Sequence, residues 1–445
     1  MRIQIARLAV CLALVGGTLA APARAAELST VDLVDVRASY RLLTETFYQP
    51  LDGHAVVSGA RDALVAQLKK NGFAGALLPA VHAPENTTDA LTEIAADIDA
   101  ANLLSKSSDH SLTYVALSGM AKAAGDKYTE FFSPDALKAF NAPLSPEKIS
   151  GIGVLLEIDP DTKVPRTFYV TPNSPAERAG LQAGDELRAI DGTPTVGFTI
   201  EKTSTLLRGK AATNVSLEIE RDGKPLPTPL VATRGAVHVP TVLYKLLPSD
   251  VGYINILVFG EPTAQEFSTA VARLESKHAR GYIIDVRNNG GGYVDAAVSI
   301  VSHFINVGPI VSQVERGPHE IQFDADGTAI EPKPLAVLVN GFSASASEIT
   351  AGALHDSGLA TLVGTRTYGK GVVQTVTYLP GSVAIKITTA KYLTPKRHDL
   401  NRVGIEPDIT VAASKNARFA EPATDAQLEA AVGVIAKKVA RIPES

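Results

Sequence analysis

The stretch that decides the fold is Leu335-Ala-Val-Leu-Val-Asn-Gly-Phe-Ser-Ala-Ser-Ala-Ser-Glu-Ile349. It opens on an apolar run, which predicts a short buried strand over 335–340. Gly341 marks a turn after that strand, and a helix is predicted to open near Ser345 and to cover 345–354. A buried strand that passes through a short turn into a helix is a building unit of an α/β core.

The same alternation continues on both sides of this stretch. Short apolar runs predict further strands, and segments with apolar residues at helical spacing predict the helices between them. The strands are expected over 251–257, 282–286 and 360–364, and the helices over 263–277 and 293–304. We therefore predict an α/β core over 234–412 whose helices cover its sheet, and a last amphipathic helix over 425–439 within 413–445.

Two regions of different character precede this core. Residues 27–145 are predicted to be helical, because apolar residues recur at helical spacing over 31–47, 87–100 and 112–124. Residues 147–233 instead show short alternating strands separated by glycine turns, which predicts a β-rich domain with short helices. Roughly 420 residues are too many for one hydrophobic core, so the expected fold class is a multidomain α/β protein.

The first 25 residues are typical of a secretion signal. A basic start, Met1-Arg-Ile-Gln-Ile-Ala-Arg7, precedes an apolar run over 8–20 and a small-x-small cleavage site at Ala23-Arg-Ala25. The apolar run is shorter than the ~20 residues that span a bilayer, which argues against a membrane anchor. Cleavage near Ala25 predicts an exported bacterial protein that works in the periplasm.

Composition excludes several kinds of chemistry. Cleavage removes the only cysteine, Cys11, so disulfides, zinc–thiolate sites and a cysteine nucleophile are excluded. It also removes Arg2, Arg7 and Arg24, which takes the formal charge from −5 to −8, and no basic stripe for nucleic acid is present. The nine histidines have no metal-ligand spacing, so no metal and no cofactor are expected. His355, just after the helix over 345–354, is expected to be structural.

Ser345 is the candidate nucleophile. Its place at the start of a helix directs the helix amides toward whatever binds there, and helix N-termini stabilise the negative charge of an oxyanion. On pattern alone a second interpretation is stronger, because Ser345-Ala-Ser-Glu348 is also a capping-box pattern. Ser343 and Ser347 compete with Ser345 for either role. The segment lacks the last glycine of the hydrolase elbow.

Lys370 and Gln374 favour the nucleophile interpretation of Ser345 over the helix-cap interpretation. A lysine can replace histidine as the base for a serine if burial brings its pKa well below the reference value of ~10.4. Lys370 lies between two glycines, so its stem is free to enter a crevice; the alternative is a surface lysine in a glycine-rich hairpin. Gln374, four residues on, is expected on the same face of the following strand, where it could orient the lysine. A nucleotide-binding loop over 364–371 is rejected because Gly371 stands where Ser or Thr is required.

A second glycine-rich turn could complete the site. Asp285-Val-Arg-Asn-Asn-Gly-Gly-Gly-Tyr293 connects a predicted strand to a predicted helix. Its amides could supply one oxyanion donor, with the amide of Ala346 as the other. The alternative is a tight connection with no chemical role.

Taken together, these motifs resemble the carboxy-terminal processing (tail-specific) serine peptidase family. The resemblance rests on five segments: Val251-Gly-Tyr-Ile-Asn-Ile256, the glycine-rich turn over 285–292, Ser343-Ala-Ser-Ala-Ser-Glu-Ile349, Gly369-Lys-Gly371 and Gly404-Ile-Glu-Pro-Asp408. Ser174-Pro-Ala-Glu-Arg-Ala-Gly-Leu-Gln-Ala-Gly-Asp185, followed by Ile190-Asp-Gly192, resembles a PDZ domain. The family implies a PDZ domain inserted ahead of a crotonase-like (Clp-protease-like) core. Two departures are Asp126-Lys-Tyr128 for Asp-Pro-Tyr and Asn289-Gly-Gly-Gly292 for Asn-Pro-Gly-Gly.

The resemblance implies a role for each candidate residue. Ser345 corresponds to the nucleophile, Lys370 to the general base and Gln374 to the residue that orients it, while Ala346 and Gly291 correspond to the oxyanion hole. Gly151, Ile152, Gly153 and Val154 correspond to the PDZ loop that binds the carboxylate of a protein tail. The expected function is a periplasmic serine endopeptidase acting on proteins with apolar C-termini, with no cofactor. A homo-oligomer or an adaptor protein would fit the family, and the alternatives are a non-catalytic PDZ scaffold and an esterase or amidase.

Overall fold

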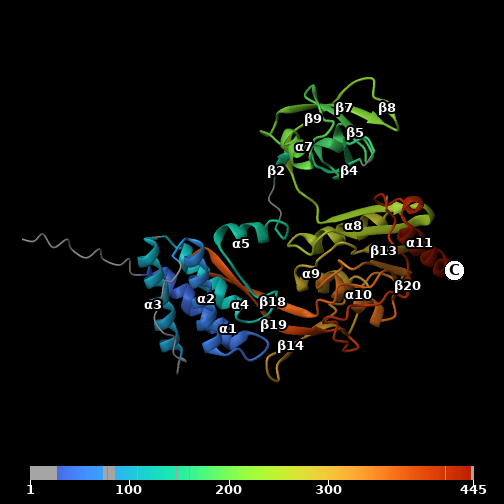
Figure 1. Cartoon of the computed structure of the whole chain (residues 1–445). Helices are drawn as coiled ribbons and strands as arrows, with labels where there is room; N and C mark the ends of the chain where they lie inside the picture. Colours follow the sequence, from blue (N-terminus) through green and yellow to red (C-terminus); the bar gives the residue numbers. More distant parts are fainter. Residues whose placement is uncertain are drawn as a thin grey trace, which may run out of the picture.

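A computed structural model describes residues 28–73, 78, 86–107, 109–145, 149–159, 161–415 and 417–441. The predicted secretion signal lies outside these residues. Three parts are distinct in Figure 1: N-terminal helices, a β-rich domain (149–237) and an α/β core. None of the helices in the described ranges is both long enough and apolar enough to cross a membrane.

The core is built on a six-stranded sheet. Its strands lie in the order β11 (Val242–Leu247), β12 (Val251–Ile256), β13 (Gly281–Asp285), β16 (Leu335–Val339), β17 (Ala360–Gly364) and β20 (Ile409–Thr410). β11 pairs with β12 in the antiparallel sense, and every other neighbouring pair is parallel. The four strands predicted for the core are confirmed as β12, β13, β16 and β17, whereas β11 was not predicted.

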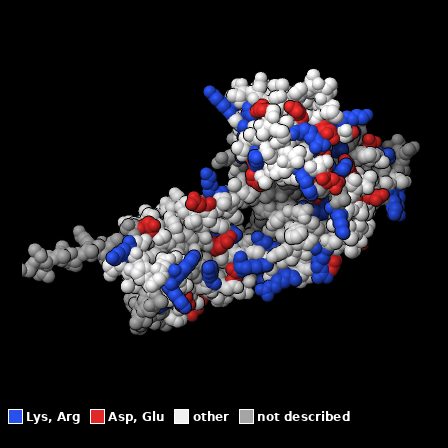
Figure 2. Space-filling model, turned by 45° about the horizontal axis from the view of Figure 1, so that its top comes forward, with Lys and Arg blue, Asp and Glu red and all other residues white. Residues whose placement is uncertain are grey.

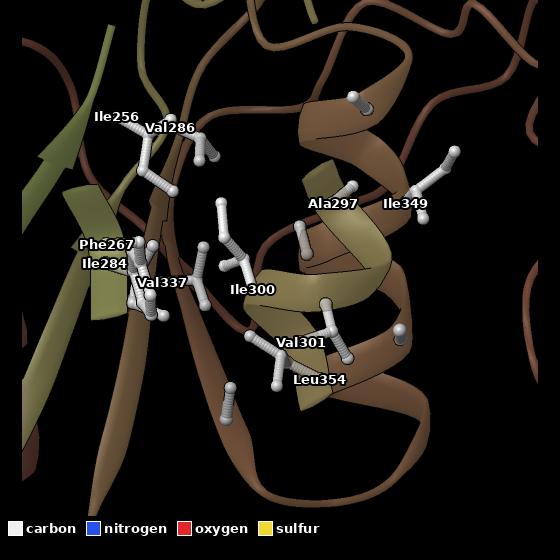
Figure 3. Close-up of a cluster of buried hydrophobic side chains, with 14 of the residues drawn as sticks. Ile256, Phe267, Ile284, Val286, Ala297, Ile300, Val301, Val337, Ile349 and Leu354 are labelled. Atoms are coloured by element: carbon white, nitrogen blue, oxygen red, sulfur yellow. The ribbon is translucent and has the colours of Figure 1, made fainter. Parts of the chain in front are cut away.

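Both faces of this sheet are buried. α8 (Thr263–Glu275), α9 (Val294–Ser302) and α10 (Ala346–Asp356) pack on one face, and α11 (Ala426–Val439) packs on the other. Alternate residues of one strand serve the two faces: Ile284 joins the first cluster and Ile283 the second. Figure 3 shows α9 and α10 side by side, with Ile300 and Val301 of α9 among the packed side chains. These four helices confirm the predicted ones.

A second sheet joins the core to the N-terminal helices. It has the order β1 (Glu130–Phe132), β19 (Val383–Leu393), β14 (Pro309–Glu315) and β15 (Glu320–Asp324), and β18 (Val372–Leu379) also pairs with β19. The helices α1 (Thr30–Thr46), α2 (Gly53–Lys70), α3 (Thr87–Ser105) and α4 (Ser111–Lys122) bury Leu379, Val383, Ile385 and Ile387 of the β18–β19 hairpin. Helices α1, α3 and α4 were predicted. Helix α2 was missed, although Val56, Val57, Ala60, Leu64 and Leu68 are buried at helical spacing.

The N-terminal region also contributes β1 and α5 (Pro134–Asn141), which were not predicted. β1 pairs with β19 of the hairpin, so this region shares a sheet with a segment from the C-terminal part of the chain. Residues from about 126 onward are thereby held against the hairpin.

The β-rich domain contains the four strands predicted for it. β3 (Val154–Ile158), β4 (Pro165–Val170), β5 (Glu186–Ile190) and β7 (Asn214–Arg221) form its sheet, with β6 (Thr193–Pro194), β8 (Lys224–Pro225) and β9 (Leu230–Thr233) at its margins. Two helices, α6 (Pro175–Arg178) and α7 (Ile200–Leu207), accompany it. β2 (Ile149–Gly151) pairs with β10 (Gly235–Val237), so the strand partner of the domain's first strand lies beyond the predicted boundary at 233.

The β-rich domain meets the core across a cleft of about 800 Å³. Phe419, from the segment before α11, packs against Phe168 and Tyr169 of β4 and against Tyr253 of β12, with ring centroids 5.1, 5.7 and 5.5 Å apart. Figure 2 shows a hollow between the two parts, and on this face acidic and basic side chains are interspersed.

Candidate active site

Three turns converge at one edge of the six-stranded sheet. β13, β16 and β17 are neighbouring parallel strands, so their carboxyl ends lie at the same edge. The glycine turn follows β13, the serine turn follows β16, and the loop that carries Lys370 follows β17. Open α/β sheets bind ligands at the carboxyl ends of their strands. The topology therefore brings together segments that are far apart in the sequence.

Ser345 occupies the N-cap position of α10 with a strained backbone. Its φ of 57° and ψ of −117° lie in a region that residues with a side chain rarely adopt. Such strain costs of order 1–3 kcal/mol and clusters at functional sites. The competing serines are occupied elsewhere: Ser343 Oγ donates to the Val286 carbonyl and Ser347 Oγ to the Asn289 carbonyl, each at 2.8 Å, and both residues are fully buried. Ser345 alone of the three is partly exposed.

Lys370 lies in the loop between β17 and β18 and is partly buried. Burial is the main cause that lowers the pKa of its ammonium, to about 8. The positive charges of Lys386 and Lys127 lower this pKa further, while the carboxylates of Asp126 and Glu348 raise it. Lys370 can therefore be neutral in mildly alkaline solution, as a base requires.

Close packing against residues 401–404 explains why glycine flanks Lys370 on both sides. A side chain on Gly369 would approach the Gly404 amide to 2.9 Å, and one on Gly371 would approach the Asn401 amide to 2.4 Å. Gly369 also has a φ of 84°, which favours glycine. Residues 401–404 thus press directly against the lysine loop, and this loop is a packed segment of the core.

Glu348 links the serine turn to the lysine loop. Its Oε2 accepts hydrogen bonds from the main-chain N–H groups of Ser345 (3.0 Å) and Lys370 (2.8 Å). Its Oε1 accepts from the Gly369 N–H (2.8 Å) and the Thr367 hydroxyl (2.6 Å). The glutamate is fully buried. The predicted helix cap is therefore present on the Glu348 side, but most of this carboxylate's bonds lie outside the helix.

No hydrogen bond joins Ser345 Oγ to Lys370 Nζ within the described residues. The lysine ammonium instead lies 4.8 Å from the centroid of the Tyr128 ring. Catalytic hydrogen bonds are often long before substrate binds and shorten in the complex.

The glycine turn lies directly against the serine turn. A side chain on Gly291 would come within 2.8 Å of Ser345 Cβ and 2.9 Å of the Ala346 amide nitrogen. The Asn289 carbonyl accepts from the Ala344 N–H at 3.0 Å, which ties the two turns together. The Ala346 N–H donates no hydrogen bond within the described chain. The Gly291 N–H, however, donates to Asn289 Oδ1 at 2.8 Å, so this predicted oxyanion donor is already bonded.

Gln374 does not contact Lys370 through a hydrogen bond. Its Nε2 donates to the Val372 carbonyl and to Thr388 Oγ1, both at 3.3 Å. β18 starts at Val372, after Lys370, and has an irregular register between Val373 and Gln374, so the orienting role expected of Gln374 stays a prediction. Thr388 Oγ1 in turn donates to Asp126, which connects Gln374 to the N-terminal region.

Tyr128 and Lys127 were not predicted as site residues. Lys127 Nζ donates to the Tyr368 hydroxyl at 2.8 Å and also lies 4.8 Å from the Tyr128 ring centroid. Both residues belong to the Asp126-Lys-Tyr128 segment, whose only sequence signal was its place in the family resemblance. His355 lies away from these residues, where its Nε2 pairs with Asp408 at 3.1 Å.

A second candidate site is a groove of about 380 Å³ on the β-rich domain. All four predicted loop residues, Gly151, Ile152, Gly153 and Val154, line it, and α7 forms the opposite wall with Ile200, Ser204 and Leu207. The carbonyls of Ile152 and Gly153 accept from the Ala176 and Thr171 N–H groups at 2.8 and 3.0 Å. Their own N–H groups donate no hydrogen bond within the described chain. Arg208, just after α7, also lines the groove and is exposed.

Comparison with known proteins identifies the family of the core and of the β-rich domain. The family model described as peptidase family S41 matches residues 250–411, and a PDZ domain model matches residues 169–221. The carboxyl-terminal-processing protease of Synechocystis sp. is 36% identical over 334 residues, covering 74% of this chain and 78% of that protein. The carboxy-terminal-processing protease of Bartonella bacilliformis is 35% identical over 309 residues, covering 68% and 70%.

A solved structure of a candidate S41 protease from Bacteroides fragilis has a TM-score of 0.50 at 17% identity, covering 70% of this chain and 87% of that chain, which reflects a shared fold. The matched domains define a serine-type endopeptidase with a PDZ domain. The chain belongs to the carboxyl-terminal-processing protease family, within peptidase family S41. The predicted family, fold class and enzyme class are confirmed.

Proposed function

We propose that this chain is a periplasmic endopeptidase that captures the C-terminal tail of a protein in its PDZ groove and cleaves the protein with Ser345 and Lys370. The observation that carries the proposal is the pairing of a strained, partly exposed serine with a lysine whose pKa is about 8. Both lie on adjacent turns and are bonded to the same carboxylate oxygen.

The first chemical step forms an acyl-enzyme. Neutral Lys370 Nζ takes the proton from Ser345 Oγ as this oxygen attacks the carbonyl carbon of the scissile peptide. The negative charge that develops on the carbonyl oxygen is stabilised by the Ala346 N–H at the start of α10. When the intermediate collapses, the C–N bond breaks and the lysine ammonium returns its proton to the leaving amine.

The second step releases the product. Lys370, neutral again, takes a proton from water, and the hydroxide attacks the acyl carbon. The bond from this carbon to Ser345 Oγ breaks, and the ammonium reprotonates the serine. Gly291 supplies the second oxyanion donor once its N–H leaves Asn289. The cycle uses side chains and main-chain N–H groups of this protein, and water.

The PDZ groove binds a tail as an additional strand. β3 is the edge strand of its sheet, since it pairs with β4 alone, so one row of its backbone groups is available to a peptide. The unpaired N–H groups of Ile152 and Gly153 lie where the terminal carboxylate would be bound. Apolar side chains of the tail then pack against Leu207 and Ile200 of α7.

The periplasmic location rests on the sequence of residues 1–25. N-terminal sequencing of the mature protein from a periplasmic extract tests it. A mature chain that begins at Ala26 would support the proposal, and one that retains the basic start would contradict it.

The catalytic assignment is tested by incubating wild-type protein, Ser345→Ala and Lys370→Ala with an unfolded polypeptide that ends in an apolar tail. Both variants are expected to lose at least about 1000-fold in kcat/KM. Lys391→Ala is the matched control, because this lysine lies on β19, next to the start of β18, but pairs with Asp399 at an exposed position. Cleavage by Ser345→Ala at the wild-type rate would exclude this serine as nucleophile.

A comparison of the polypeptide with small acyl esters distinguishes the proposed endopeptidase from an esterase or amidase. An esterase or amidase with this pair would hydrolyse small acyl esters faster than the polypeptide and would not respond to the identity of the tail. We expect the polypeptide to be the better substrate, and replacement of its apolar tail by an acidic one to raise KM.

A further inference from the structure

We propose that Glu348 is a positioning residue that holds the nucleophile and the base in register by binding the main-chain N–H groups of Ser345 and Lys370 through one oxygen atom. This inference rests on the proposed roles of Ser345 and Lys370. It adds a third side chain on which their mutual geometry depends.

The contacts exceed what a helix cap needs. A cap satisfies donors in the first turn of its own helix, and for α10 the bond from the Ser345 N–H does this. The bonds from Lys370 N–H, Gly369 N–H and Thr367 Oγ1 come from a different loop, 19 to 22 residues further along the chain. The carboxylate therefore connects two separate segments through the main chain of the two residues that are proposed to react.

Burial makes this connection difficult to replace. Glu348 is fully buried, with 0% of its surface accessible to solvent. If the carboxylate were removed, each of its main-chain donors would be left without an acceptor. An unsatisfied buried donor costs about 1–3 kcal/mol, so the lysine loop would move to find other partners. A glutamine has one acceptor oxygen where the carboxylate has two, so it cannot satisfy the same donors.

The charge of Glu348 provides a signature that a structural role lacks. The groups that act on Lys370 are the cations of Lys386 and Lys127 and the carboxylates of Asp126 and Glu348, with the Tyr128 ring against the ammonium. Because the Glu348 carboxylate raises the pKa of Lys370, its removal lowers that pKa. The midpoint of the pH–rate profile then moves to lower pH while kcat falls. A loss of folded protein lowers the rate at every pH and leaves the midpoint in place.

Two substitutions separate the cap from the connection between segments. Glu348→Asp keeps a negative charge in the first turn of α10 but is one methylene shorter, so it caps the helix without reaching the lysine loop. Glu348→Gln keeps the length and loses the charge. We expect both to lower kcat about 100-fold, the effect of a misplacement of about 1 Å, with KM within about threefold of wild type.

The measurements are kcat and KM on the unfolded polypeptide from pH 6 to pH 10, and the rate at which a fluorophosphonate phosphonylates Ser345 Oγ with release of fluoride. Glu266→Gln is the matched control: this carboxylate also accepts from two main-chain N–H groups and a threonine hydroxyl, at Thr241 and Val242, but lies on α8. It is expected to keep kcat within about threefold of wild type.

Two results would overturn the proposal: wild-type kcat in Glu348→Asp, or a loss of kcat in Glu348→Gln with an unchanged pH midpoint. If Glu348→Gln does not fold, Thr367→Val carries the test, because it removes only the hydroxyl donors and acceptors of Thr367 and leaves the carboxylate in place. It is expected to lower kcat three- to tenfold at unchanged KM, and an unchanged kcat would contradict the proposal. Cleavage by Ser345→Ala instead rejects the proposed function and is distinguishable from either result.

Discussion

The two candidate sites differ in how many of their main-chain donors already have a hydrogen-bond partner within the chain. At the proposed catalytic turn, the carboxylate of Glu348 accepts hydrogen bonds from main-chain donors of the serine turn and of the lysine loop, and the residues at the start of α10 are fully buried. At the PDZ groove, the N–H groups of Ile152 and Gly153 donate to nothing within the described chain, and β3 leaves one edge unpaired. The two turns of the first site are bonded to each other before a ligand arrives, whereas the second site leaves the bonds of its strand edge for a ligand to complete.

This difference in hydrogen bonding fits the role that we propose for each site. Acyl transfer requires reacting atoms at defined separations, which a packed and internally bonded site provides. Recognition of many different tails requires main-chain bonds that any sequence can form, which an open edge strand provides. Substitutions at the first site should therefore act on kcat, and substitutions at the second on KM.

The pH dependence gives the largest effect expected at the catalytic site. In the proposed mechanism the neutral form of Lys370 is the active one, so kcat/KM is expected to rise as pH increases through the lysine pKa of about 8. Between pH 6 and pH 9 the neutral fraction rises roughly 100-fold. In Lys386→Ala a positive charge that lowers this pKa is removed, so the midpoint moves to higher pH. Rates on the unfolded polypeptide across this range measure both, and a flat wild-type profile would argue against Lys370 as the base.

The second prediction concerns the groove. Arg208 is exposed, lines the groove and forms no ion pair within the described chain, so it can attract the carboxylate of a tail. Arg208→Glu is expected to raise KM about tenfold for substrates with a free C-terminus and to leave kcat unchanged. Lys210→Glu is the control, since it makes the same charge change two residues away and outside the groove.

Amidation of the substrate C-terminus sharpens this test. The amide removes the charge that Arg208 is proposed to bind, so wild type and Arg208→Glu should then have similar KM values. An Arg208 effect that persists with the amidated substrate would show that the arginine acts on some other part of the tail.

Local pattern accounts for the parts of the fold that were predicted. β13, β16 and β17 are continuous apolar runs because both faces of their sheet are buried, and each is followed by glycine or by a helix start. The second sheet gave a weaker signal. β15 is mostly exposed, and β18 and β19 form a long hairpin whose buried positions depend on helices from the other end of the chain. Its arrangement is a tertiary property that no local pattern contains.

The residues of the candidate site also fall into two groups, those that local sequence pattern predicted and those that it did not. Ser345, Ala346 and Gly291 belong to turns whose strands are neighbours, so the order of the sheet brings them together. Glu348 was interpreted as a helix cap, which describes its bond to Ser345 but not its bonds to the loop over 367–370. Tyr128 lies more than 200 residues before Lys370 in the sequence, and the pairing of β1 with β19 brings its segment to the site.

The smallest effect is expected where the N-terminal region meets the lysine loop. Lys127 is exposed, donates to the Tyr368 hydroxyl at 2.8 Å and slightly lowers the pKa of Lys370. Because exposed contacts contribute little, Lys127→Ala should keep kcat within about threefold of wild type and move the pH midpoint slightly upward. Lys122→Ala, an exposed lysine in the last turn of α4, is the control and should leave the midpoint in place. A large loss of kcat in Lys127→Ala alone would mean that the catalytic site is not fixed by the core, and that the N-terminal region takes part in ordering it.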